Sequence, residues 1–217
     1  MPQIGRLSVV AAAMLAASVT ASADVSYNLV CAPLHGVLGK DYFDYADPVS
    51  KPRLEIVEQY HFTPEVENLI RGATGLVPAD LDFVLRALPN HYRALSAMGR
   101  WQIRNPKLPD SVEGRIDTAE CYFKRAIAFR GDDSTLQMLY AVYLHQAGRL
   151  QDADQAYTRA EELGRGGAEL FYNRGLLKLR LGDVAAAENY AQKAYALGYP
   201  LRGLQNRIER AKSGKKS

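Results

Sequence analysis

The sequence predicts an all-α protein in which helix pairs stack into a short α-solenoid behind an irregular N-terminal arm. The first observation is internal repetition: when residues 134–167 are written above residues 168–201, small residues coincide at a period of 34. The second is that apolar residues recur three and four positions apart between these small residues, as on one face of a helix. The third is a glycine at the end of each first helix, where a left-handed residue is needed. Each repeat therefore reads as helix, tight turn, helix.

The coinciding small residues indicate where helices cross closely. They are Ala141 with Gly175, Gly148 with Gly182, Ala153 with Ala187, and Ala160 with Ala194. A larger side chain at a crossing point would push the two backbones apart. Gly148 and Gly182 end the first helices, and the carboxylate of Asp183 can accept hydrogen bonds from the free amides of the helix that follows.

These residues resemble the tetratricopeptide repeat family, whose units have small residues at three fixed positions and a large apolar residue near the last of them. The two copies supply Ala141, Ala153, Tyr157 and Ala160, then Gly175, Ala187, Ala191 and Ala194. Ala191 departs from the large residue of the pattern. A broken third copy precedes them, with Ala97, Ala119, Phe123 and Ala126 in matching roles and a loop inserted around residues 105–113.

The first residues predict export. A short start with one basic side chain is followed by an apolar run over residues 7–19 and by Ala21-Ser22-Ala23, the pattern of a signal peptide cleaved before Asp24. The alternative is a buried N-terminal helix, since this run is too short to cross a bilayer. Without residues 1–23 the chain keeps 26 basic and 24 acidic side chains, or 26 − 24 = +2, and no later apolar stretch could span a membrane. We therefore expect a periplasmic or secreted protein that does not bind nucleic acid.

The mature chain divides by composition. Residues 24–62 combine several Tyr and Phe with Pro and Gly, which predicts an extended arm wrapped on the helices, with one short strand within residues 54–62. Residues 63–133 should hold the N-terminal helices, over about 63–72, 80–88 and 90–104 (capped by Asn90), together with the broken copy. Residues 134–211 should hold the two repeats and a capping helix over 200–211, before a solvated basic tail at 212–217.

Cys31 and Cys121 are the two cysteines of the chain. In an exported protein a lone pair favours a disulfide, which would tie the arm to the first helix pair. The alternative is two buried free thiols. A metal site is not expected, because the two cysteines lack closely spaced partners.

The resemblance implies a concave groove lined by the first helix of each repeat. The groove residues it implies here are Met138, Val142, His145, Tyr172, Asn173, Leu176 and Arg180. Their mixture of apolar, aromatic and basic side chains suits an amphipathic helix or an extended peptide. The protein's own arm could instead fill this groove.

Signals of catalysis are sparse, so no catalytic residue and no cofactor are predicted. None of the four histidines has a second His or a Cys at metal-ligand spacing, and no serine elbow or phosphate-binding glycine loop occurs. We expect an interaction scaffold with a protein or peptide partner, as an accessory factor of an envelope assembly. The alternative is an enzyme or carrier with a site between the Tyr-rich arm and the repeats. A deep polar pocket there would favour the alternative, whereas an open groove with exposed Tyr172 and Leu176 would favour the scaffold.

Overall fold

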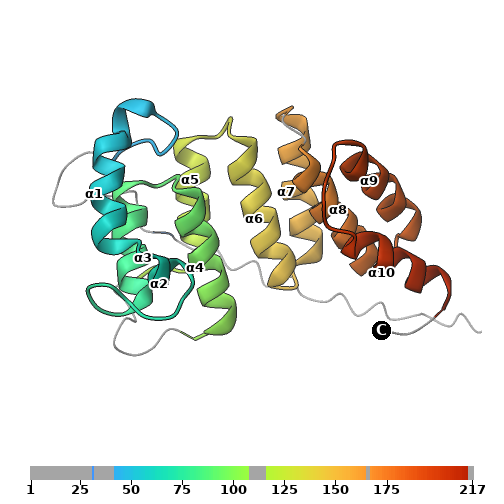
Figure 1. The fold of residues 1–217 in the computed structure, drawn as a ribbon, viewed down its shortest axis with the longest axis horizontal. Coiled ribbons are helices and arrows are strands. Elements are labelled where there is room, and N and C mark those ends of the chain that lie inside the picture. The colour runs from blue at the N-terminus through green and yellow to red at the C-terminus, as the bar shows by residue number, and fades with distance from the viewer. Residues whose placement is uncertain (1–30, 32–41, 108–115, 165–166, 215–217) are drawn as a thin grey trace, which may run out of the picture. The chain divides into compact units, whose positions relative to one another are not determined.

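The structure, a computed structural model, describes residues 31, 42–107, 116–164 and 167–214 of the chain. Its regular elements in these ranges are all helical (Figure 1). In chain order they are the 3-10 helix η2 (Pro48–Ser50) and the α-helices α1 (Lys51–His61), α2 (Pro64–Glu67), α3 (Val77–Ala87), α4 (Tyr92–Arg104), α5 (Ala119–Phe129), α6 (Ser134–Gln146), α7 (Leu150–Glu162), α8 (Ala168–Arg180), α9 (Val184–Ala196) and α10 (Gly203–Lys212).

The predicted repeat period is confirmed by the helix boundaries. Helices α6 and α8 begin 168 − 134 = 34 residues apart, and α7 and α9 begin 184 − 150 = 34 residues apart. The small residues at the predicted crossings are fully buried, among them Ala141, Ala153, Ala187 and Ala194. Close helix packing therefore explains why the repeats keep small side chains at these positions.

The turns within the repeats also follow the prediction. Gly148 and Gly182 both have φ of 83°, a left-handed conformation that costs a glycine little. After α6 the amide of Arg149 donates to the carbonyl of Leu144 at 2.9 Å, which closes the end of the helix. The Asp183 carboxylate accepts from the amide of Ala186 at 2.9 Å and caps α9, as expected.

Among the described residues the core forms three clusters, which follow one another along the chain. The first is formed by α3, α4 and α5 with Phe62, Val66 and Leu136; the second lies between α6, α7 and α8; the third joins α8, α9 and α10. Leu204 and Ile208 of α10 are buried in the third cluster. Helix α10 thus covers the last apolar face, as the capping helix was expected to do, although Ala211 is exposed and does not join that face.

The strand expected within residues 54–62 is wrong, because Lys51–His61 is helix α1. Pro52 lies in its first turn, a position where proline is tolerated because its missing N–H has no partner in the helix. Leu54 and Val57, three residues apart, are half-buried, whereas Ile56 is 59% exposed. Burial therefore follows a helical period and not the two-residue alternation that predicted a strand.

The N-terminal helix boundaries also differ from those expected. Helix α2 ends at Glu67, and Leu69 has φ of 60°, which leaves the helical region before the expected end at Gly72. Helix α4 is capped by His91, whose side chain accepts from the amide of Ala94 at 3.1 Å. Asn90, the expected cap, instead accepts from the amide of Tyr45 and donates to Asp44.

A disulfide joins Cys31 to Cys121 of α5, with their Cα atoms 5.2 Å apart, which confirms the predicted pairing. Other contacts hold the described part of the arm on the helices. Tyr42 packs edge-on against Phe129, and the ring of Tyr45 lies 4.3 Å from that of His91. The predicted signal peptide, most of the inserted loop and the last three residues lie outside the described residues.

Candidate functional site

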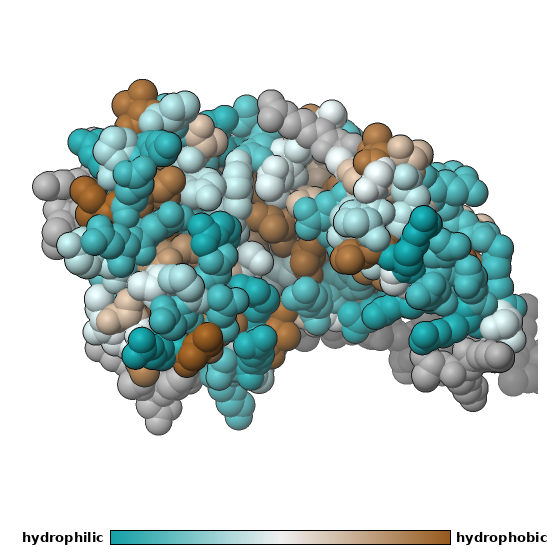
Figure 2. All heavy atoms as spheres, in the orientation of Figure 1, coloured by the Kyte–Doolittle hydropathy of each residue, from teal (hydrophilic) through white to brown (hydrophobic). Residues whose placement is uncertain are grey.

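A cavity of about 510 Å³ lies where α6, α8 and α10 meet. Its lining consists of His145 in the last turn of α6, the α8 residues Leu176, Leu179 and Arg180, and the α10 residues Arg207, Arg210 and Ala211. We call it the α6–α8–α10 cavity. Figure 2 shows hydrophobic spheres between the positions of α6 and α10 in Figure 1, beside hydrophilic spheres over α10.

Close packing of α10 on α8 fixes one wall of this cavity. Gly175 has no side chain, and Leu204 of α10 occupies the space beside it. A Cβ added at Gly175 would lie only 2.5 Å from the Cδ2 atom of Leu204. Tyr172 of α8 stacks on Tyr199 with ring centroids 4.3 Å apart. Because Leu204 and Ile208 turn inward on α10, Arg207 is left on its exposed side.

The cavity is strongly cationic. The Arg180 guanidinium donates to the backbone carbonyl of His145 at 2.7 Å, which uses one of its N–H groups and leaves others for a ligand. Within the described residues, Arg207 and Arg210 have no side-chain ion pair or hydrogen bond. Burial, followed by the charges of Arg180 and Arg207, lowers the pKa of His145, so this histidine is neutral at pH 7.

Two carboxylates of α9 and α10 have partners outside the cavity lining. Glu188 of α9 forms an ion pair with Lys212, and Glu209 of α10 accepts from the side-chain amide of Gln205 at 3.1 Å. No carboxylate is among the described residues that line the cavity. The three arginines therefore place positive charge beside the apolar surface of Leu176, Leu179 and Ala211 without an acidic partner in that lining.

This arrangement suits binding better than catalysis. Among the described residues of the lining, one group titrates near neutrality, His145, and none is a nucleophile or forms an acid–base pair. Within the described ranges, no group of three or more His, Cys, Asp or Glu side chains could hold a metal ion. Guanidinium groups around an apolar floor are instead suited to carboxylates or other anions attached to an apolar group.

The structure brings together three of the seven residues expected in the groove: His145, Leu176 and Arg180 line the cavity. Met138 and Val142 are half-buried against the second core cluster, and Asn173 is half-buried outside the lining. Two further lining residues, Arg207 and Arg210, were not predicted to face the groove. The sequence signal for them is their three-residue spacing on α10, at exposed positions beside the buried Leu204 and Ile208.

The expectation that Tyr172 would be exposed is wrong. Its side chain is 8% exposed, because Tyr199 stacks on its ring and α10 packs over it. A Cβ at Gly203 would lie 2.9 Å from the Tyr172 hydroxyl, which shows how closely α10 approaches. Tyr172 therefore positions α10, and it does not offer a surface to a partner.

A second cavity of about 480 Å³ lies among the N-terminal helices, and its lining includes His61, Thr74, Asp82 and Arg86. Its polar groups already have partners in the protein. The buried Asp80 carboxylate accepts from the side chain and amide of Thr74 and lies 3.0 Å from Nδ1 of His61. Asp82 accepts from Arg86 at 2.8 Å. These contacts hold the loop before α3 in place, and they occupy Nδ1 of His61 and the Asp82 carboxylate.

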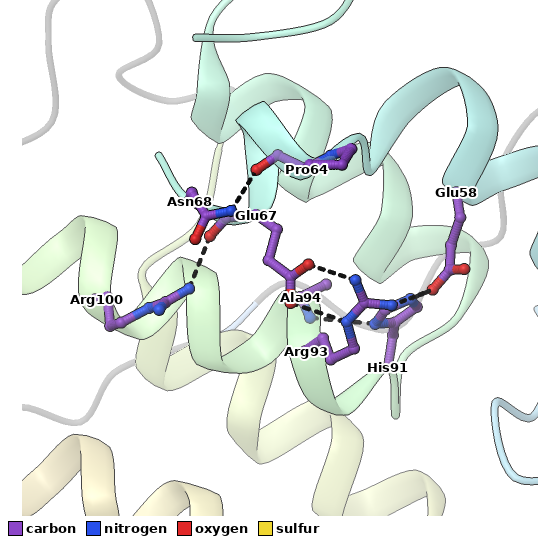
Figure 3. Close-up of polar contacts among 8 residues, drawn as sticks. All are labelled: Glu58, Pro64, Glu67, Asn68, His91, Arg93, Ala94 and Arg100. Atoms are coloured by element: carbon purple, nitrogen blue, oxygen red, sulfur yellow. Dashed lines mark hydrogen bonds and ion pairs between the residues drawn. The ribbon is translucent and has the colours of Figure 1, made fainter. Parts of the chain in front are cut away.

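A further polar network joins α1 and α2 to α4 (Figure 3). His91 is fully buried; its Nε2 donates to Glu58 at 2.9 Å while its Nδ1 accepts from Ala94. Burial lowers the pKa of His91 to about 3, so the imidazole is neutral at pH 7. Arg93 forms ion pairs with both Glu58 and Glu67. His91 is closed off from solvent and both its ring nitrogens have partners, so its role is to stabilise the helix packing.

Comparisons with known proteins support the fold. No protein-family profile and no curated protein matches the sequence. A solved structure from the functional characterization of Pseudomonas aeruginosa pilF is similar, with a TM-score of 0.52 at 18% identity over 76% of this chain and 68% of that chain. The chain therefore has a helical-repeat fold of the tetratricopeptide type, as the sequence predicted. No helix in the described part of the chain is long and apolar enough to cross a membrane.

Proposed function

We propose that the protein is an exported scaffold that holds a peptide or helix of a partner protein in the α6–α8–α10 cavity. The observation that carries the proposal is this cavity: open, with an apolar floor and arginines that have unused hydrogen-bond donors. Stacked helix repeats commonly use such surfaces between successive first helices to bind other proteins. Aliphatic and arginine side chains in one hollow are suited to a protein segment.

Two observations support an exported location. The N-terminal sequence has the three parts of a signal peptide. The Cys31–Cys121 disulfide favours an oxidising compartment such as the periplasm or the exterior of the cell. An accessory role in an envelope assembly would fit this location.

Affinity capture tests the scaffold function. Tagged native protein and two tagged double variants are each recovered from the native cells. The test variant, Leu179→Ala/Arg180→Ala, changes the cavity. The control variant, Arg159→Ala/Leu197→Ala, changes exposed residues elsewhere. We expect the test variant to keep its helical content. The amount of one specific partner captured with it should fall at least about tenfold, because a few central residues dominate binding energy. Equal recovery of every captured protein by both variants would contradict the proposal.

A further inference from the structure

The charge of the α6–α8–α10 cavity narrows the class of partner. We propose that it recognises an acidic peptide segment, whose carboxylates are held by Arg207, Arg210 and Arg180 while a neighbouring apolar side chain lies on Leu176 and Leu179. This inference rests on the proposed function and specifies the chemistry of its ligand.

The first argument is charge complementarity. Three guanidinium groups from two helices line one hollow, and no described residue of that lining is a carboxylate. Two of them, Arg207 and Arg210, are exposed and without an ion-pair partner among the described residues. Other arginines of the repeat region are paired, such as Arg149 with Glu120 and Asp152, and Arg174 with Glu161. The cavity is thus a place where the array leaves arginines available for an external anion.

The second argument is the geometry of the donors. Arg207 and Arg210 are three residues apart on α10, so their side chains project from neighbouring positions on one side of the helix. Arg180 projects from the last residue of α8 across the cavity and is braced by the His145 carbonyl. Planar guanidinium groups bind carboxylates through paired hydrogen bonds, so two acidic side chains of one segment could be held at once.

The third argument separates a peptide from a nucleic acid. The floor is aliphatic, formed by Leu176, Leu179 and Ala211, and no Phe, Tyr or Trp occurs among the described lining residues. Single-stranded nucleic acids are usually held by aromatic rings that stack on the bases, and such rings are missing from this lining. Aliphatic side chains next to carboxylates are common in acidic amphipathic segments, which match both the floor and the arginines.

Fluorescence anisotropy with defined probes tests the inference on the full mature chain. The probe is a labelled peptide that alternates Glu with Leu; the matched peptide has Gln in place of each Glu. The test variant is Arg207→Gln/Arg210→Gln. The control variant Arg71→Gln/Arg159→Gln removes the same charge from exposed arginines outside the cavity.

We expect the acidic peptide to bind native protein and the control variant equally, and the test variant about tenfold or more weakly, since charge-assisted hydrogen bonds are lost. High salt should weaken the binding. The inference is overturned if the Gln peptide binds as tightly as the Glu peptide, if the control variant loses as much affinity as the test variant, or if native protein binds neither peptide. It is also overturned if an oligonucleotide of equal charge binds more tightly at the same arginines.

The capture experiment separates the two proposals. If the acidic peptide fails to bind but capture still depends on Leu179 and Arg180, the scaffold stands and its ligand is not acidic. If capture is also independent of these residues, both proposals are wrong.

Discussion

A Cβ at Gly175 would lie 2.5 Å from Cδ2 of Leu204, so the missing side chain of one residue makes room for the other. Leu204 is fully buried and has little space to move aside. This contact seats α10 on α8 and thereby places the α10 arginines beside the α8 side of the cavity.

Changing Gly175→Ala should therefore destabilise the protein by about 1–3 kcal/mol, because added volume forces a buried side chain out of its rotamer. Urea unfolding followed by circular dichroism measures this. Gly75→Ala is the control, because a Cβ there meets nothing within 4 Å and Gly75 does not have positive φ. Equal unfolding midpoints for the two variants would show that α10 does not pack on α8 in this way.

The helix crossings inside the repeats give a second prediction. Ala153→Leu or Ala187→Leu should lower stability by about 1–3 kcal/mol, since both side chains are fully buried where paired helices meet. Arg159→Leu is the control, because it introduces the same side chain at an exposed site. The contact that it removes is the ion pair of Arg159 with Glu162 at 3.2 Å. Thermal melts should separate the first two variants from the third; three similar melting temperatures would refute the repeat register.

The buried His91 predicts a dependence of stability on pH. Its pKa is about 3 in the folded protein, below the value of about 6.5 expected when unfolded, so the unfolded chain binds more protons between these values. Stability should therefore fall as the pH is lowered from about 6.5 towards about 3. Burial raises the pKa of Glu58, which opposes this trend, whereas hydrogen bonds and ion pairs lower the pKa of Glu67, which adds to it at lower pH.

Urea unfolding across this pH range measures the effect. His91→Asn keeps a side chain that can cap α4 but removes the titrating group. The variant should show a flatter profile in the upper part of this pH range, where the carboxylates titrate least. If the free energy of unfolding changes with pH equally in the variant and the native protein, His91 is not held in the neutral form by burial.

The disulfide gives a fourth prediction. It closes a loop of 121 − 31 = 90 residues, for which the chain-entropy model gives about 4–5 kcal/mol of stabilisation. The Cys31→Ser/Cys121→Ser variant should melt at a lower temperature, and a protease should cut near residue 31 sooner than within the repeats. If peptide mass spectrometry of exported protein finds both thiols free, the pairing is wrong in the cell.

The repeats could be predicted from sequence because each helix pair copies the spacing of the other. Ala153 and Ala187 occupy one position in both copies, and that coincidence fixes the helices and their turns. The N-terminal region has no such copy. The apolar residues of 54–62 fit a strand by alternation, whereas the structure forms a helix there that packs Val57 against the first core cluster.

The site could be predicted only where its residues belong to the repeat pattern. His145, Leu176 and Arg180 follow from their positions in the repeat. Tyr172 has an equivalent position, but the repeat pattern does not include the capping helix that buries it. Arg207 also lies outside the repeat, so its place in the cavity depends on how α10 packs on α8.

Site-specific photo-crosslinking in the native cells tests the central claim most directly. A photoreactive residue is placed at Leu179, in the cavity, or at Arg159, which is exposed on α7. The scaffold account predicts that the Leu179 site yields a distinct crosslinked partner, that the Arg159 site does not yield it, and that Arg207→Gln/Arg210→Gln diminishes it. The same products from both positions, or none from Leu179 in protein that is folded and exported, would contradict a partner-binding cavity between α6, α8 and α10.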